Sequence, residues 1–261
     1  MSTLDLKVLS ANCQGLRNRD KRYDVLRYLK ETNAAIACLQ DTHLTANDTN
    51  SVKEIWNKCY LHGLRTNSRG VAILFSDNFE HEILEYNKDT NGNYIQMLVA
   101  CTSIKINMIN IYAPNHDDPC FFQNIKTIAN NVDSDYTVIC GDFNLVLDPV
   151  LDSHNYARIN NPRARMEVLS IANELDLTDA YRCHHPTTKR YTWRRKNPLK
   201  QARLKNFLVS STFMDLVEKC GVKSSYRSDH SLLELSIVFN KFTRERVFGN
   251  LIITSCIKKI T

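Results

Sequence analysis

Short apolar runs alternate with amphipathic stretches along the chain. Residues 34–39 and 71–75 are apolar throughout, which is typical of strands buried on both faces of a sheet. Two β-prone runs, 94–101 and 104–111, are separated only by Thr102-Ser103 and predict a hairpin. The remaining predicted strands are 6–10, 137–140, 191–193, 204–209 and 232–238.

Three stretches carry apolar residues at helical spacing. Asn161 followed by Pro162 predicts an N-cap and a first-turn proline for one helix, whose spacing Met166, Leu169 and Ala172 continue. The other two predicted helices are 21–32, on Val25, Leu26 and Leu29, and 120–131, on Phe121, Ile125, Ile128 and Val132. The alternation, without repeats or long linkers, predicts one α/β domain with mixed sheets covered by helices.

Polar side chains gather where the predicted strands end or begin, and ligand sites form at such positions because a rigid sheet fixes the side chains. Singly, each has a plain interpretation as a turn former, a cap or a surface residue. Together, their carboxylate and amide oxygens suit Mg²⁺ or Mn²⁺, and with a neighbouring His and Tyr they indicate metal-assisted phosphodiester hydrolysis. No P-loop is present, which argues against NTP hydrolysis. The residues are Asn12, Asp41, Tyr112, Asp142, Asn144, Ser228, Asp229 and His230.

The composition narrows the class of protein. Of 261 residues, 43% are hydrophobic and 24% are charged, which argues against a disordered chain. No run approaches the roughly 18 apolar residues of a membrane-spanning helix, and the N-terminus has no signal-peptide pattern. Nine cysteines are scattered without a C-x-x-C pair, so we expect reduced, mostly buried thiols in an intracellular protein with no membrane partner.

The net charge of +6 is unevenly distributed. No Asp or Glu occurs between Ala180 and Met214, and that stretch holds nine Lys and Arg residues. The rest of the chain therefore carries a net charge of 6 − 9 = −3. A basic block on a slightly acidic body indicates a polyanion contact, and a solvated basic loop is the equally weighted alternative.

Eight motifs in order give the chain a resemblance to a known family. From about Leu6 to Phe239 it resembles the endonuclease/exonuclease/phosphatase superfamily, and within it the endonuclease domain of LINE-type (non-LTR) retrotransposons. The motifs are SANCQGL (10–16), LQDTHL (39–44), GVAILF (70–75), NIYAPN (110–115), GDFN (141–144), YTW (191–193), RLKNFLVS (203–210) and SDHSLL (228–233).

The resemblance implies a four-layer α/β sandwich of the DNase I type, with two facing mixed β-sheets flanked by helices. It also implies a divalent ion, Mg²⁺ or Mn²⁺, held by Asn12, Asp41 and Asp229. Tyr112 would contact the scissile phosphate, Asp142 would activate water positioned by Asn144, and Asp229 and His230 would act on the phosphate. Thr192 and Ser228 would support the DNA-facing side.

The basic block is placed by the same resemblance. In related endonucleases the hairpin between YTW and RLKNFLVS enters a DNA groove beside the cut site. The residues of that loop that we expect to contact double-stranded DNA are Arg194, Arg195, Lys196 and Lys200.

Two departures from the family pattern affect the chemistry. Asp41 replaces a glutamate and is one methylene shorter, so we expect weaker metal binding rather than none. Lys205 stands where the family has an aspartate that orients the histidine equivalent to His230. Neutralising a comparable aspartate in serine proteases lowers the rate about 10⁴-fold, which we take as an upper guide.

These expectations define the function to be tested. We expect residues 1–239 to form the nuclease domain, 240–261 to be an unassigned tail, and the isolated domain to be monomeric. The domain would nick target DNA for target-primed reverse transcription, in the nucleus, with an activity that Lys205 reduces. The alternatives are an inactive DNA-binding remnant or domesticated copy and, least favoured, an enzyme acting on a small phosphoester.

Overall fold

The computed structural model describes residues 4–64, 68–156 and 160–239. The predicted tail, 240–261, lies outside the described residues, so the domain division stays a prediction. The strands are β1 (Leu4–Asn12), β2 (Ile36–Gln40), β3 (Lys58–His62), β4 (Val71–Phe75), β5 (Glu82–Lys88), β6 (Tyr94–Cys101), β7 (Ile104–Tyr112), β8 (Tyr136–Asp142), β9 (Ser153–His154), β10 (Leu177–Asp179), β11 (Trp193–Arg195), β12 (Lys200–Ala202), β13 (Lys205–Ser210), β14 (Val217–Lys223) and β15 (Leu232–Phe239). The helices are α1 (Arg19–Glu31), α2 (Thr49–Lys53), α3 (Pro119–Asn130), α4 (Pro162–Glu174) and α5 (Ala180–His184), with short 3₁₀ helices at Ala46–Asp48 and Ser211–Leu216.

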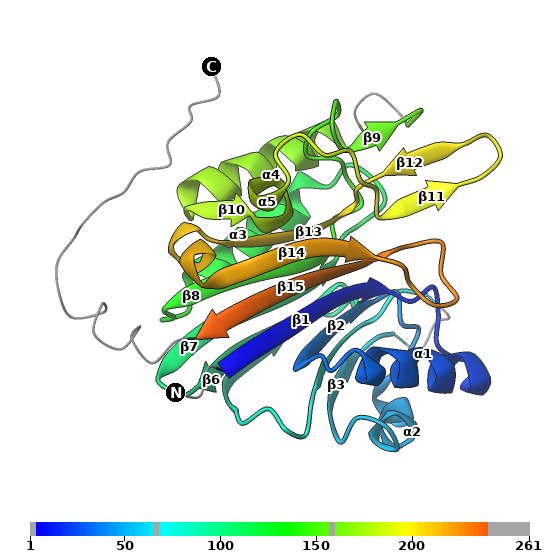
Figure 1. Cartoon of the computed structure of the whole chain (residues 1–261), viewed down its shortest axis with the longest axis vertical. Helices are drawn as coiled ribbons and strands as arrows, with labels where there is room; N and C mark the ends of the chain where they lie inside the picture. Colours follow the sequence, from blue (N-terminus) through cyan, green and yellow to red (C-terminus); the bar gives the residue numbers. More distant parts are fainter. Residues whose placement is uncertain (1–3, 65–67, 157–159, 240–261) are drawn as a thin grey trace, which may run out of the picture.

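The strands form two large mixed sheets and one small one. The first large sheet has the order β14–β15–β1–β2–β4–β3, and the second has the order β10–β13–β8–β7–β6–β5. Each contains one parallel pair, β1 with β2 and β7 with β8, and the other pairs are antiparallel. The small sheet, β11–β12–β9, carries the predicted basic hairpin, which projects from the end of the molecule where β1 ends (Figure 1).

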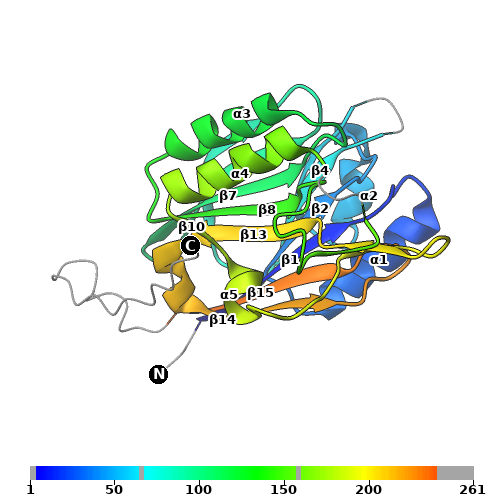
Figure 2. The same ribbon diagram turned by 90° about the horizontal axis from the view of Figure 1, so that it is seen from above.

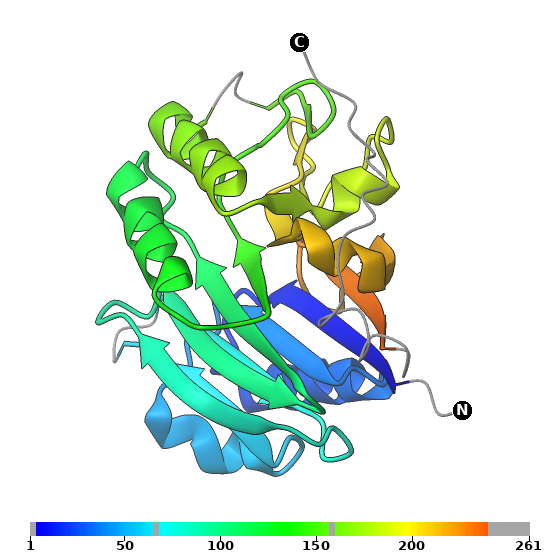
Figure 3. The same ribbon diagram turned by 90° about the vertical axis from the view of Figure 1, so that its left-hand side faces the viewer.

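The two large sheets pack face to face and helices cover their outer faces (Figure 3). Helices α3 and α4 lie over the sheet that contains β7 and β8 (Figure 2), while α1 and α2 cover the other sheet. The central apolar cluster takes residues from both sheets, including Val8, Ile73, Met97 and Phe207. This arrangement is the predicted four-layer α/β sandwich, so the fold prediction is confirmed.

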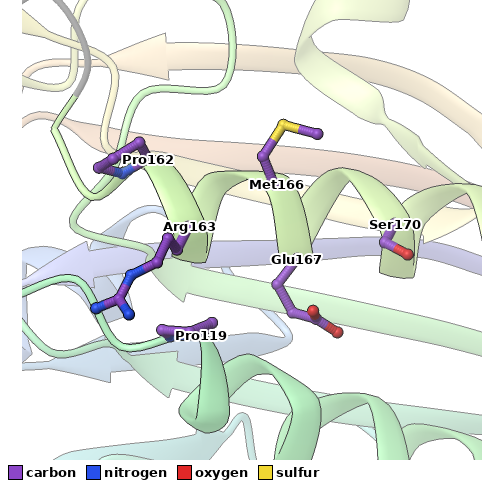
Figure 4. Close-up of a pocket in the computed structure, with 6 residues that line it drawn as sticks. All are labelled: Pro119, Pro162, Arg163, Met166, Glu167 and Ser170. Atoms are coloured by element: carbon purple, nitrogen blue, oxygen red, sulfur yellow. The ribbon is translucent and has the colours of Figure 1, made fainter.

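The helix predicted to begin at Pro162 is present as α4, but the predicted buried face is wrong. In α4 the buried residues are Ala164, Val168 and Ile171, whereas Met166 is 61% exposed. Met166 lines a hollow on the outer side of α3 and α4 (Figure 4). The spacing of three apolar residues predicted the helix but not its orientation, because a second apolar set, also at helical spacing, is the one that packs against the sheet.

Asn161 is the residue before α4, but its side chain does not cap the helix. Its backbone has φ = 52°, and its Nδ2 donates instead to the carbonyl oxygen of Asn144 at 3.0 Å. The side chain therefore ties the start of α4 to the loop that carries Asn144, which the N-cap prediction did not anticipate.

Two smaller sequence predictions concern cysteines and membrane spans. Cys13, Cys38, Cys101, Cys140 and Cys220 are buried free thiols, in agreement with the prediction of mostly buried cysteines. Within 4–64, 68–156 and 160–239, no helix is both long and apolar enough to cross a membrane.

Candidate active site

Three neighbouring strands place polar residues side by side at one end of the second sheet. Tyr112 on β7 is the register partner of Asp142 on β8, and Asp142 is in turn the partner of Lys205 on β13. Register partners project from the same face of a sheet, so these three side chains form a row. The tight approach of β7 and β8 requires Gly141, because a Cβ there would lie 2.0 Å from the carbonyl oxygen of Ile111.

Asp142 is the buried centre of the site, with no solvent exposure. Its Oδ2 accepts a hydrogen bond from Asn12 Nδ2 at 2.9 Å, and its Oδ1 accepts one from the backbone N–H of Asn144 at 3.1 Å. Burial raises the pKa of the Asp142 carboxyl even though Lys205 and these donors lower it. A carboxylate with a raised pKa is a better proton acceptor than an ordinary aspartate, which suits a general base.

Asn12 brings the first sheet into contact with the second. It ends β1 and is 4% exposed, and its Oδ1 accepts the backbone N–H of Gln14 at 3.1 Å. Asn144 follows Asp142 by two positions, and its Nδ2 donates to the carbonyl oxygen of Ala113. Both amide side chains are therefore held by the backbone, and the Oδ1 of Asn144 is the atom that could receive a water proton.

Asp41 follows β2 and faces the same region. Its backbone has φ = 52°, and its Oδ1 lies 3.0 Å from Nε2 of His43. The negative charge of Asp41 contributes to the raised pKa of Asp142, of Asp229 and of Tyr112. Burial is the largest cause of each of these three shifts, and the hydroxyl of Tyr112 therefore stays protonated at neutral pH.

The loop before β15 closes the site. Ser228 Oγ donates to the carbonyl oxygen of Asn12 at 3.0 Å and accepts the backbone N–H of His230 at 3.1 Å. Asp229 is exposed, and its Oδ1 lies 3.6 Å from Nε2 of His230. One serine thus connects the ends of β1 and β15 and fixes where the histidine sits.

His230 lies between two charged groups from the second sheet. Its Nδ1 is 3.0 Å from Nζ of Lys205 and 3.5 Å from Oδ2 of Asp142. Burial, followed by the positive charge of Lys205, lowers the pKa of His230 well below its usual value. Burial also lowers the pKa of Lys205, to about 8, although Asp142 and Asp229 favour its charged form.

These contacts bring together the side chains that the sequence placed at strand ends. Hydrogen bonds, ion pairs and strand register connect most of them into one cluster across both sheets. Asp41 belongs to it because its negative charge acts on Tyr112, Asp142 and Asp229. The clustered residues are Asn12, Asp41, Tyr112, Asp142, Asn144, Ser228, Asp229 and His230.

The predicted DNA-binding residues divide into two groups. Arg194, Arg195 and Lys196 are exposed and Lys200 is partly exposed on the β11–β12 hairpin, and none of them belongs to this cluster. Thr192 is fully buried, and its Oγ1 accepts the backbone N–H groups of Leu204 and Lys205. This burial suits the supporting position that the family resemblance implies for Thr192.

The sequence reasoning missed several residues that hold the site in place. His43 could have been noticed, because it follows Asp41 by two positions within LQDTHL. Asn110, within NIYAPN, carries no such local signal. It lies on β7, yet its Nδ2 donates to the carbonyl oxygens of Leu39 and Ala72 on the other sheet, both at 2.9 Å.

Comparisons with known proteins agree with this geometry. A protein of Xenopus laevis, the "Transposon TX1 uncharacterized 149 kDa protein", is 29% identical over 241 residues that cover 88% of this chain. The chain spans 18% of that relative's length. This similarity confirms the predicted resemblance to a transposon protein.

Solved structures of DNA-processing enzymes share the fold. The AP endonuclease LMAP from Leishmania major superposes with a TM-score of 0.75 and 16% identity, covering 90% of this chain and 88% of that one. The catalytic domain of APE2 from Xenopus laevis gives 0.74 and 18%, covering 89% and 92%. The model of the Endonuclease/Exonuclease/phosphatase family matches residues 9–230. On this match, which includes every residue of the cluster, the chain belongs to the Endonuclease/Exonuclease/phosphatase family.

Proposed function

We propose that this chain is a divalent-metal-dependent DNA endonuclease of retrotransposon type, which nicks double-stranded target DNA and leaves a 3′-hydroxyl for reverse transcription. The nick would be made in the nucleus, where the target DNA lies. The observation that carries the proposal is the buried Asp142, hydrogen-bonded by Asn12 and Asn144 and 3.5 Å from His230. The family match and the transposon relative support a nuclease of this origin.

The donor set fits a divalent ion that keeps part of its water shell. Among the residues that the structure describes, no group of three His, Cys, Asp or Glu side chains is close enough to hold a metal by itself. Mg²⁺ in phosphoryl-transfer sites is commonly held by one or two carboxylates, waters and substrate phosphates. The negative charge of Asp41 adds to the larger effect of burial in raising the pKa of Asp142 and of Asp229, and a bound cation would relieve this repulsion. Asp41, Asn12 and Asp229 would hold it.

The chain's own residues would divide the remaining work. Asp142 would accept a proton from the attacking water, which the Oδ1 of Asn144 would orient. Tyr112, whose hydroxyl stays protonated, would donate a hydrogen bond to a phosphate oxygen. His230 would contact the phosphate from its Nε2 side. A bound Mg²⁺ or Mn²⁺ would supply neutralisation of the negative charge that develops on the phosphate.

A plasmid-nicking assay with Mg²⁺ or Mn²⁺ tests the proposal. We expect wild-type protein to convert supercoiled plasmid to the nicked circle. Asp142→Ala and His230→Ala should each reduce the rate by at least about 100-fold, because each removes a group that acts in the transition state. Asp133→Ala, at an almost fully exposed aspartate near the other end of β7, is the matched control and should leave the rate unchanged. Equal rates for wild type and Asp142→Ala would contradict the proposal.

One observation favours a second candidate, a DNA-binding remnant or domesticated copy without catalysis. Lys205 places an ammonium group against His230, where the family resemblance implies a carboxylate. DNA binding by the wild type without nicking in either metal would identify this alternative.

A further inference from the structure

Lys205 is the most unusual charged residue of the site. It lies on β13 with no solvent exposure, and its Nζ is 3.0 Å from Nδ1 of His230, 25 positions away in the chain. Neither the family resemblance nor the mechanism above uses this contact. The contact bears on which ring nitrogen of His230 carries the proton, because Lys205 Nζ lies beside Nδ1.

Two arrangements of the proton are possible. If Lys205 is an ammonium, it donates to Nδ1, which must then be unprotonated, and the ring proton lies on Nε2. If the proton were on Nδ1, that nitrogen would donate to Oδ2 of Asp142, and a neutral Lys205 would have to accept or turn away. Lys205 is the nearer partner of Nδ1, at 3.0 Å against 3.5 Å for Asp142, and a lysine in its ordinary ammonium form can only donate, which favours the first arrangement.

The other side of the ring faces the exposed Asp229, whose Oδ1 lies 3.6 Å from Nε2 of His230. Asp229 is exposed, so the Nε2 side is the side that a substrate phosphate can approach.

We propose that Lys205 is a positioning residue that donates a hydrogen bond to Nδ1 of His230 and so fixes the ring as the tautomer whose N–H is Nε2, on the side that a phosphate can approach. This inference rests on the proposed function for the identity of the phosphate, but the tautomer itself does not depend on nicking. An orienting carboxylate would instead favour a proton on Nδ1 and the charged ring.

Long-range ¹H–¹⁵N NMR of the side-chain imidazoles tests the proposal in full-length protein with Mg²⁺ at neutral pH. The His230 signals are assigned as those that disappear in His230→Asn. We expect wild-type His230 to show a protonated Nε2 and an unprotonated Nδ1. In Lys205→Met the donor is gone, and Asp142 Oδ2 is the remaining partner of Nδ1, so protonation should move to Nδ1. Lys205→Asp should move it to Nδ1 as well.

Two outcomes overturn the proposal. A protonated Nδ1 in the wild type contradicts the assigned tautomer, and an unchanged Nε2 tautomer in Lys205→Met removes the positioning role. Lys105→Met, at the opposite end of β7 from Tyr112, is the matched lysine control and should leave His230 unchanged. The signals of His62, on β3, whose Nε2 lies 2.9 Å from Oδ1 of Asp89, report that the variants remain folded.

Nicking separates the two proposals. If the orienting carboxylate is what limits the reaction, Lys205→Asp should nick faster than wild type, and Lys205→Met should not. Absence of nicking in the wild type and all variants would count against the proposed function and would leave the NMR result to decide the tautomer.

Discussion

Folding buries the amine of Lys205, and the free-energy cost of burying its charged form depends on pH. Burial lowers its pKa from an ordinary 10.5 to about 8. Between these two values the unfolded chain binds the proton that the folded chain has lost, so the wild type gains stability as the pH rises through this range. Below pH 8 both states hold the proton, and the full cost of the buried charge is present.

We therefore predict that Lys205→Met is more stable than the wild type at pH 7. One unit of pKa corresponds to about 1.4 kcal/mol, so the advantage should shrink by on the order of 3 kcal/mol as the pH rises to 10.5. Urea unfolding at pH 7, 9 and 10.5 measures it. The partly exposed Lys105→Met should show no such trend, and an advantage that stays constant with pH would contradict the buried-charge account.

Asp41 gives a second prediction at the level of one residue. Its carboxylate is one methylene shorter than the glutamate implied by the family resemblance, and His43 holds its Oδ1. Asp41→Glu should extend the carboxylate toward the ion and lower the Mg²⁺ concentration for half-maximal nicking severalfold. A Mg²⁺ titration of nicking measures this, with Asp133→Glu as the control. A higher Mg²⁺ requirement in Asp41→Glu would show that the shorter side chain is matched to its surroundings.

The β11–β12 hairpin is an element whose position is set by contacts at its base. The backbone N–H of Ser231 donates to the carbonyl oxygen of Thr192 at 2.7 Å, and Trp193 pairs with His230. The buried Arg203, just after β12, binds both carboxylate oxygens of Asp152, at 2.8 and 2.7 Å. The basic residues are therefore carried by a hairpin joined directly to the segment that leads from His230 into β15.

We predict that the hairpin contributes electrostatic DNA binding rather than chemistry. Each phosphate contact that is lost lowers the slope of log affinity against log salt by about 0.9. The triple variant Arg194→Ala, Arg195→Ala, Lys196→Ala should thus reduce the slope by up to about 2.7 in an Asp142→Ala background, which prevents cleavage. Fluorescence anisotropy with a labelled duplex measures this, and Lys105→Ala is the control. An unchanged slope would show that these three basic residues do not contact DNA phosphates.

The edge strands show where sequence patterns were insufficient. Every interior strand of the two large sheets was predicted, whereas the four that end the sheets, β3, β5, β10 and β14, were not. Most side chains of β5 are exposed along its length, and buried and exposed side chains alternate irregularly in β14. An edge strand has one paired neighbour and is exposed to solvent, so its residues need not be apolar, and its pairing partner decides its conformation.

The site as a whole depends on how the two sheets are aligned. Asp41 and Asn12 come from one sheet, while Tyr112, Asp142 and Lys205 come from the other. Buried Asn110 spans the interface. Its Nδ2 binds two carbonyl oxygens of the first sheet and its Oδ1 accepts Gln40 Nε2 at 2.8 Å.

Asn110→Leu should destabilise the protein by about 2–3 kcal/mol, because it removes buried hydrogen bonds without replacing them. It should also reduce nicking, since β2 and Asp41 lose their connection to β7. Asn107→Leu is a matched control: Asn107 is equally buried on β7 but bonds Gln96 and Ala129 on the outer, helix-covered side. It should cost similar stability and leave nicking unchanged below the unfolding transition. Equal loss of nicking in both would contradict the alignment role.

The amino-acid sequence by itself determined the inner strands, the three longer helices α1, α3 and α4, and the residues of the candidate site. The apolar runs of the inner strands have no other stable environment than a sheet covered on both faces, and the polar residues follow directly where those runs end. The tertiary structure alone decided the edge strands, the buried face of α4, the burial of Thr192 and the connection that Asn110 makes between the two sheets. These depend on which segments meet in space, and a hydrogen bond between residues 71 positions apart leaves no periodic trace in the sequence.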